Sequence, residues 1–168
     1  MATHVLFEGD TGVIVREDGL TVEGVSLTGL IDAAKRAALL ADRIELCGGL
    51  GVEDAAKVIV AVGANANVRL NRYGYESLEQ VAAYKVAFED GKVGDGAFLY
   101  GSAQSTPLKY HDGIMTAGVA DESSLIERAR EAQATCAGII ELYGGLGAQA
   151  AATVRRVTGE ALPVGFID

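Results

Sequence analysis

The sequence contains few residues that could build a covalent or metal-held scaffold. Two cysteines, Cys47 and Cys136, cannot form a disulfide framework in a chain of 168 residues. His4 and His111 are the only histidines, and neither lies at ligand spacing from a second histidine or cysteine, so we expect no metal site. No apolar run approaches the roughly 20 residues that cross a bilayer, and no basic segment followed by an apolar run opens the sequence. We therefore expect a cytoplasmic protein with no membrane partner.

Basic residues are also scarce. Fourteen lysines and arginines stand against 23 aspartates and glutamates, which gives a formal net charge of −9 and a pI near 4.7. Such a surface repels a phosphate backbone, so nucleic-acid binding is not expected. A small-molecule ligand or another protein, including a second copy of the chain, is the expected partner.

The residues that are abundant indicate the α/β class. Hydrophobic residues make up 49% of the chain but aromatic residues only 6%, and 22 glycines accompany 2 prolines. This composition suits short turns and close packing of helices on a sheet better than it suits a β-sandwich. The chain is long enough to bury a hydrophobic core without a staple.

One eight-residue motif occurs twice, as IELCGGLG at 44–51 and IELYGGLG at 140–147. Downstream of the motif the two segments stay in register at an offset of 96, with identical pairs that include Ala55/Ala151, Val58/Val154 and Val68/Val164. We infer a tandem duplication, with repeat 1 at 1–75 and repeat 2 at 93–168. Between them, apolar residues at helical spacing predict a linker helix at 76–92.

Each repeat reads as strand, variable loop, strand, helix, strand, helix, strand. The predicted strands are near 4–8, 20–27, 43–47, 67–72, 97–101, 113–119, 139–143 and 163–167. The predicted helices are near 29–41, 52–62, 122–136 and 148–158. This alternation implies parallel strands with both helices of a repeat on one face of its sheet. If the two bare faces or sheet edges meet, the ββαβαβ-like repeats form a pseudo-twofold eight-stranded sandwich or barrel with helices outside.

Strand alternation assigns side chains to the polar interior of this arrangement. Ile44 and Leu46 should point to the helices, which turns Glu45 toward the opposite face. By the same rule, Glu141 points inward from the second repeat. The other side chains assigned to this interior are Cys47, Arg69, Asn71, Tyr73 and Tyr143.

The motif strands, the helix VEDAAKVIVAVG after the first of them and the closing strand PVGFID resemble a small bacterial domain family of unknown function. Its members carry an ELCGGFG-type motif, followed by a helix and a final strand that contains Val-Gly. The resemblance covers most of each half of the chain. It implies no activity and assigns no catalytic residue.

Glu45 and Glu141 are the strongest candidates for chemistry. Two carboxylates on inner faces could lie close together, and their proximity and burial would favour protonation of one of them. Different neighbours would make the two environments unequal, as a division into acid and base requires. The alternative is structural, with Glu45 paired to Arg69 and Glu141 to another donor, because a buried charge must be paired.

Further candidates would support these carboxylates. His111, in the loop at 105–113, titrates near neutral pH and is a third catalytic candidate, with a solvated surface loop as the alternative. Arg69 could anchor an anionic group of a substrate through bidentate hydrogen bonds. The remaining substrate-binding candidates are Asn71, Tyr73, Cys47, Tyr100, Tyr143 and Lys109.

The glycines after the second motif strand suggest one more kind of site. Gly145 and Gly147 lead into a helix, where free backbone N–H groups and the helix dipole could hold an anion. The alternative is a tight turn between strand and helix that only glycine can make.

The functional hypothesis is a small, cofactor-independent acid/base enzyme, either a lyase or an isomerase. It would act on a small molecule with an anionic or carbonyl group, in a polar pocket between the repeats. Glu45, Glu141 and His111 would be catalytic, and no cofactor is expected. The alternative is a non-catalytic module that binds small molecules or assembles into homo-oligomers.

Overall fold

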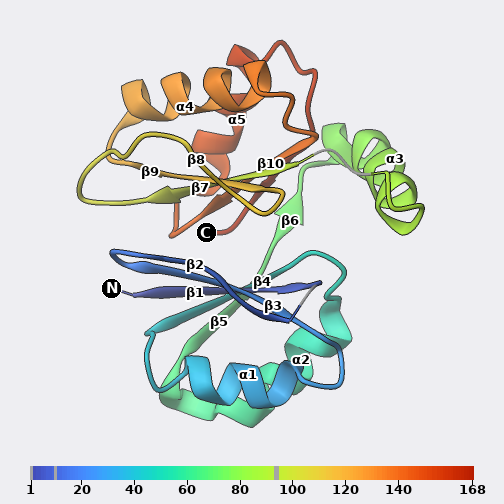
Figure 1. The fold of residues 1–168 in the computed structure, drawn as a ribbon, viewed down its shortest axis with the longest axis vertical. Coiled ribbons are helices and arrows are strands. Elements are labelled where there is room, and N and C mark those ends of the chain that lie inside the picture. The colour runs from blue at the N-terminus through green and yellow to red at the C-terminus, as the bar shows by residue number, and fades with distance from the viewer. Residues whose placement is uncertain (1, 10, 93–94) are drawn as a thin grey trace. The chain divides into compact units, whose positions relative to one another are not determined.

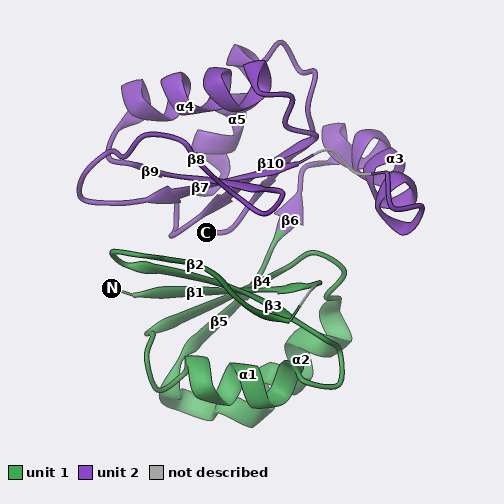
Figure 2. Cartoon of the chain, viewed as in Figure 1, with its two compact units in different colours: residues 1–71 green, residues 72–168 purple. Residues whose placement is uncertain are grey.

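The computed structural model divides the chain into two compact units, unit 1 at Met1–Asn71 and unit 2 at Arg72–Asp168 (Figure 2). The described residues are 2–9, 11–92 and 95–168. Four positions, at the predicted starts of the two repeats and in the first variable loop, lie outside them: Met1, Asp10, Val93 and Gly94. Each unit has its own sheet and its own hydrophobic core, so each is described by itself.

Unit 1 is a five-stranded mixed sheet with two helices on one face (Figure 1). The strand order is β2-β3-β1-β4-β5, and all neighbours are parallel except the β2–β3 hairpin. The strands are β1 Thr3–Glu8, β2 Gly12–Glu17, β3 Leu20–Val25, β4 Arg43–Cys47 and β5 Asn67–Leu70. The helices are α1 Leu30–Ala37, α2 Val52–Val62 and the short 3₁₀ helix η1 Gly63–Asn65.

The core of unit 1 lies between this sheet and its helices. Leu6, Ile44 and Leu46 are fully buried in it. Ala33 and Ala34 of α1 pack against the same cluster, and their small side chains allow the helix to approach the strands closely. Burial of each large aliphatic side chain contributes about 1.5–3 kcal/mol, so this face fixes the orientation of β4.

Unit 2 is a six-stranded mixed sheet, again with two helices on one face (Figure 1). The order is β6-β11-β10-β7-β9-β8, with antiparallel strands at both edges and parallel strands between them. Its strands are β6 Arg72–Tyr73, β7 Gly96–Gly101, β8 Lys109–His111, β9 Ile114–Val119, β10 Ile139–Tyr143 and β11 Val164–Phe166. Its helices are the 3₁₀ helix η2 Tyr75–Ser77, then α3 Leu78–Glu89, α4 Glu122–Ala134 and α5 Gly147–Val157.

The α/β class is confirmed in both units, and a helix, α3, lies within the predicted linker. The described residues contain eleven strands in two open sheets, whereas the sequence predicted eight. The additional strands are the edge strands β2, β6 and β8, two of which form hairpins inside segments expected to be loops. The alternation predicted for the first motif strand is confirmed, because Ile44 and Leu46 face the helices and Glu45 faces away.

Within the described part of the chain, every helix is too short or too polar to traverse a bilayer.

Candidate functional site

Strand register aligns one row of residues across the helix-free face of the sheet in unit 2. Ile140 and Leu142 pack in the core beneath α4 and α5, so Glu141 between them faces the opposite side. From one edge of the sheet to the other, the row reads Tyr73, Gly165, Glu141, Phe98, Thr116 and Lys109. Tyr73, at the start of unit 2, thus lies in the same row as Glu141 of the second motif strand.

Two phenols bind the carboxylate of Glu141, one on each oxygen. Tyr73 Oη donates a hydrogen bond to Oε1 at 2.6 Å, and Tyr143 Oη donates one to Oε2 at 2.6 Å. Both distances lie in the range of charge-assisted O–H···O⁻ hydrogen bonds. Glu141 is only 4% exposed, so these bonds form at a buried carboxylate.

Glycine at position 165 allows the first of these bonds. Tyr73 and Glu141 lie two strands apart, about 10 Å between backbones at the usual strand spacing. Gly165 stands between them in the same row and carries no side chain, so the Tyr73 ring can extend over β11. The other phenol is held by Phe98, whose ring centroid lies 5.0 Å from that of Tyr143 at an interplanar angle of 56°.

Glu45, the corresponding residue of the first motif, has a different environment. Arg43 lies two residues earlier on the same face of β4, and its Nε forms an ion pair with Glu45 Oε1. Their side chains are 10% and 0% exposed. Arg69, the predicted partner, is in register with Glu45 on β5 but is exposed, so the ion pair predicted with Arg69 is corrected to one with Arg43.

Sequence differences between the two segments account for this contrast. At the offset of 96, three residues around the glutamate change: Arg43 to Ile139, Cys47 to Tyr143 and Arg69 to Gly165. Arg43, the cation of the ion pair, has isoleucine at the matching position, while Tyr143 supplies one phenol and Gly165 leaves room for the other. The first glutamate therefore has an arginine on its own strand, and the second has tyrosine hydroxyls.

The other candidates divide between the two units. In unit 1, Cys47 is buried on the helix-free face of β4, and the backbone N–H of Asn71 donates to the carbonyl of Leu46 at 2.8 Å. In unit 2, Tyr100 is buried on β7 and is in register with Tyr143, one row along from Glu141 on the same face of the sheet.

Strand order separates two predicted residues from Glu141. Lys109 and His111 lie on the edge strand β8, and two strands stand between β8 and β10. At the usual strand spacing this is about 14 Å between backbones. The structure therefore does not bring His111 or Lys109 to the Glu141 carboxylate.

The glycine turn after β10 has the geometry of a connection between strand and helix. Gly144, Gly145 and Gly147 all have positive φ, between 66° and 77°. The N–H of Gly147 already donates to the carbonyl of Ile167 at 3.2 Å, and a Cβ at Gly147 would lie 3.0 Å from Asp168 Oδ1. A carboxylate beside the turn disfavours a second anion there, so the geometry favours the tight-turn alternative.

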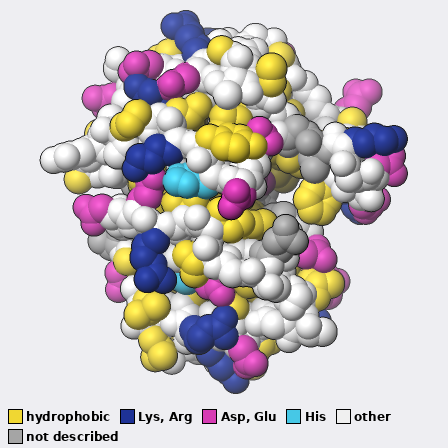
Figure 3. Space-filling model, in the orientation of Figure 1, with side chains coloured by type: hydrophobic (Ala, Val, Ile, Leu, Met, Phe, Trp, Pro, Cys, Tyr) yellow, Lys and Arg dark blue, Asp and Glu magenta, His cyan; other side chains and the backbone are white. Residues whose placement is uncertain are grey.

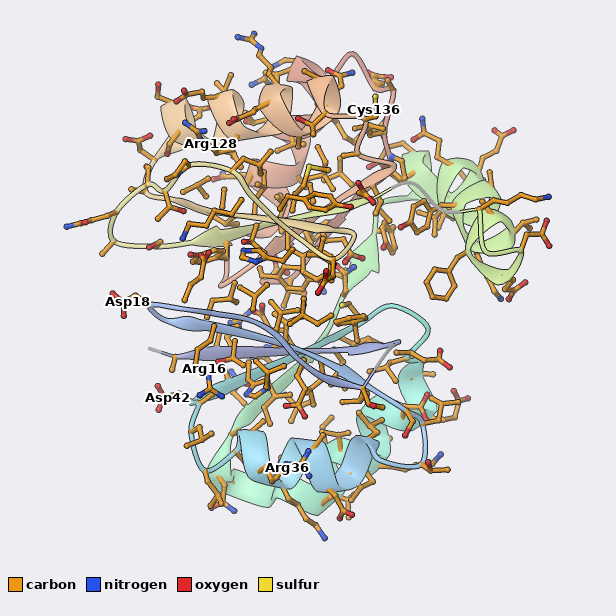
Figure 4. All side chains as sticks on the ribbon, in the orientation of Figure 1. Arg16, Asp18, Arg36, Asp42, Arg128 and Cys136 are labelled. Atoms are coloured by element: carbon orange, nitrogen blue, oxygen red, sulfur yellow. The ribbon has the colours of Figure 1, made fainter. Side chains whose placement is uncertain are left out.

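The sequence analysis did not predict a network of polar side chains on the side of the unit 1 sheet that faces the helices. His4 Nε2 lies 3.0 Å from Glu23 Oε2, and Arg36 Nη2 lies 3.1 Å from Glu23 Oε1. Burial lowers the pKa of His4, Glu23 opposes this shift, and Arg16 and Arg36 add to the lowering. Figure 4 labels these two arginines, Arg36 on α1 and Arg16 on β2. The available signal is the spacing of His4 and Leu6, which stand two residues apart on β1 and so share the face toward the helices.

The surface is mixed in charge. On the face drawn in Figure 3, acidic, basic and hydrophobic side chains are interspersed. Across residues 2–9, 11–92 and 95–168, no group of three or more histidine, cysteine or carboxylate side chains is arranged to hold a metal ion.

The model of a family of unknown function, DUF6506, matches residues 3–86 of the chain, which is half of its length. The chain belongs to the DUF6506 family. This confirms the resemblance to a small domain family of unknown function. The DUF6506 match runs from β1 through unit 1 and β6 into α3, so it includes Glu45 and Tyr73 but not Glu141. No curated protein matches the chain.

Proposed function

We propose that unit 2 carries the acid–base centre of a small, cofactor-independent enzyme, either a lyase or an isomerase. Its substrate would be a small molecule with a carbonyl or anionic group. The observation that carries the proposal is the buried carboxylate of Glu141, which accepts a 2.6 Å hydrogen bond from a phenol on each oxygen.

Glu141 would act as the base. Its carboxylate would remove a proton from the carbon next to the substrate carbonyl, and negative charge would develop on the carbonyl oxygen. A phenol is a suitable hydrogen-bond donor to that oxygen. Tyr73 or Tyr143 would turn its single O–H from Glu141 to the carbonyl oxygen, which would free one oxygen of the carboxylate to take the proton. Return of the proton to another position would give an isomer, and loss of a leaving group from the enolate would give a lyase product.

We further propose that a tandem duplication gave rise to this division of roles. In this view the two motif strands descend from one, and the copies diverged after duplication. Glu45 kept a structural role as the partner of Arg43, while the exchange of Arg69 for glycine at 165 and of Cys47 for Tyr143 opened the second carboxylate to two phenols. Catalysis would then be confined to unit 2.

Hydrogen exchange at the carbon next to a carbonyl tests this proposal across many small molecules at once. The protein is incubated in D₂O with a panel of small oxo acids, hydroxy acids and aldehydes, and loss of the C–H signal next to the carbonyl is followed by NMR. We expect the wild-type chain to accelerate deuterium incorporation into at least one panel member. Glu141→Gln should lower that rate by about 100-fold or more, the usual contribution of a general base.

Glu45→Gln is the matched control, because it alters the same position of the other motif. Exchange that continues at a similar rate in Glu141→Gln would contradict the assignment of the base. If the wild-type chain exchanges no panel member but some of them bind, the non-catalytic binding module is the better account.

A further inference from the structure

The strand that carries Tyr73 has little backbone pairing of its own. β6 consists of 2 residues, Arg72 and Tyr73, and it pairs with β11 through them. A strand this short is unusual in globular proteins and fixes its own position only weakly. The place of the Tyr73 hydroxyl on Glu141 therefore depends on what holds the chain directly before and after the phenol.

Arg72 holds the chain before the phenol. Its guanidinium carbon lies 5.1 Å from the centroid of the Phe166 ring, and its Nη2 forms an ion pair with Asp168. Both side chains of the ion pair are more than half exposed, so water screens the pair and its contribution is small. This contact is a weak anchor for β6.

Arg155 of α5 holds the chain after the phenol. Its Nη1 donates a hydrogen bond to Ser77 Oγ at 3.1 Å, and its Nε lies 3.8 Å from Glu76 Oε1. Ser77 is fully buried, and the side chain of Arg155 is only 13% exposed. Burial removes hydration from a guanidinium, so such an arginine is costly unless its fixed donors bind specific acceptors. Arg155 therefore makes a directed contact with the turn after β6.

The turn between Tyr73 and Ser77 connects this anchor to the phenol. The N–H of Ser77 donates to the carbonyl of Gly74 at 3.0 Å, at the 3₁₀ turn η2. The carboxylate of Glu76 folds back on Gly74, and its Oε1 lies where a Cβ of Gly74 would stand. Gly74 follows Tyr73 directly, so a shift of Ser77 would move the backbone that carries the phenol.

The first motif segment indicates that the helix itself does not require this arginine. At the offset of 96, Arg155 of α5 corresponds to Ile59 of α2, and both helices follow a motif strand. A helix in this place therefore forms with an aliphatic residue at the position. Arg155 and Gly165, which leaves room for the Tyr73 ring, both belong to the segment whose sheet includes β6.

We propose that Arg155 is a positioning residue for Tyr73: it fixes the turn after β6 to α5 and so keeps the Tyr73 hydroxyl on Oε1 of Glu141. The placement of the hydroxyl is a property of the protein without substrate. Its effect on rate, in contrast, rests on the acid–base function proposed above. Arg155 acts through the turn and not on the reacting atoms.

NMR of the protein without substrate tests the placement. The carboxyl carbon of Glu141 is labelled, and Tyr73→Phe gives its signal in the absence of this phenol. We expect Arg155→Ile, which installs the residue found at 59, to move the Glu141 signal toward that of Tyr73→Phe while the protein stays folded. If Arg155→Ile does not fold, Ser77→Ala replaces it, because it removes the acceptor of Arg155 and should move the signal in the same direction.

Arg156→Val is the matched control, since it exchanges the next residue of α5 for the one found at 60. The side chain of Arg156 is 68% exposed, and its Nη2 lies 3.3 Å from Thr153 Oγ1 on α5. The Glu141 signal should stay at its wild-type position in this control. A Glu141 signal that is unchanged in folded Arg155→Ile, or that moves equally in Arg156→Val, would overturn the proposal.

The deuterium-exchange assay separates this proposal from the proposed function. If the wild-type chain exchanges a panel member, Arg155→Ile should lower the rate per folded protein by about 10-fold or more, because a small misplacement of a catalytic group is costly. Arg156→Val should retain the rate. A Glu141 signal that moves without any change in rate would contradict a catalytic role for Tyr73 and support its positioning by Arg155. If the wild-type chain exchanges no panel member, the proposed function fails and the NMR result alone decides the placement.

Discussion

At the scale of single residues, neighbours two positions away decide what each motif glutamate can do. Glu45 follows Arg43 on its own strand, and Glu141 precedes Tyr143 on its strand. Side chains two residues apart on a strand share a face, so each glutamate meets the partner that its own segment supplies. The motif glutamate itself is the same in both places.

Removal of only one member of the ion pair in unit 1 should destabilise that unit strongly. Arg43→Ile, which introduces the residue found at 139, would leave a buried carboxylate without this cation and lower the free energy of unfolding by about 3 kcal/mol. Glu45→Val should cost a similar amount. The double variant should recover much of the loss, because an apolar pair can replace a buried ion pair. Urea unfolding of the four proteins measures this, and additive losses would contradict it.

His4 should make stability depend on pH. Burial lowers its pKa from the ordinary value of 6.5, so the unfolded chain takes up a proton that the folded chain resists. The contribution is fully present above about pH 6.5 and is lost as pH falls below that value. Glu23, Arg16 and Arg36 are the charged groups that act on the ring, and they are unchanged in the variant His4→Gln.

The measurement for His4 is the free energy of unfolding at several pH values on either side of 6.5. The wild-type chain should lose more stability than His4→Gln as pH falls, because carboxylates common to both proteins cancel in the comparison. If the free energy of unfolding depends on pH in the same way in both proteins, protonation of His4 does not contribute to stability.

At the scale of elements, local pattern predicted most helices and strands and failed for edge strands. Buried parallel strands such as β4 and β10 are largely apolar around the motif glutamate, and alternation assigns their faces correctly. The strands β2, β6 and β8 lie at edges, pair antiparallel and are short or solvent-exposed, so their sequences resemble loops. Local pattern places Tyr73 at the end of the previous strand, whereas it belongs to β6 in the sheet of unit 2.

Gly165 should be required for the hydrogen bond between Tyr73 of β6 and Glu141. Gly165→Val places a branched side chain in the row between Tyr73 and Glu141, so the Tyr73 hydroxyl should lose the Glu141 oxygen. Valine suits a strand, and β11 should therefore still form. The loss can be followed by ultraviolet absorption or NMR of the Tyr73 hydroxyl, with Tyr73→Phe as the reference. A Tyr73 signal that is unchanged in Gly165→Val would contradict the role of glycine here.

At the scale of the whole molecule, part of the candidate site could be predicted from sequence. Alternation selects Glu141 and Tyr143 because both lie on one apolar strand, and they do share a face. The partnership of Tyr73 with Glu141 spans 68 residues and depends on which strand lies beside β11. Local pattern carries no information on that choice. The partnership of Arg43 with Glu45 is different, because the two residues stand two apart on one strand and alternation alone puts their side chains on the same face.

The central claim is that the two motif glutamates have separate roles, structural for Glu45 and catalytic for Glu141. The most direct measurement compares Glu45→Gln and Glu141→Gln in two assays, unfolding free energy and deuterium exchange into the best panel substrate. We predict opposite results: Glu45→Gln loses stability and retains the exchange rate per folded protein, and Glu141→Gln loses the exchange rate by about 100-fold while remaining folded. Equal losses of exchange in the two variants, or retained exchange in Glu141→Gln, would contradict the claim.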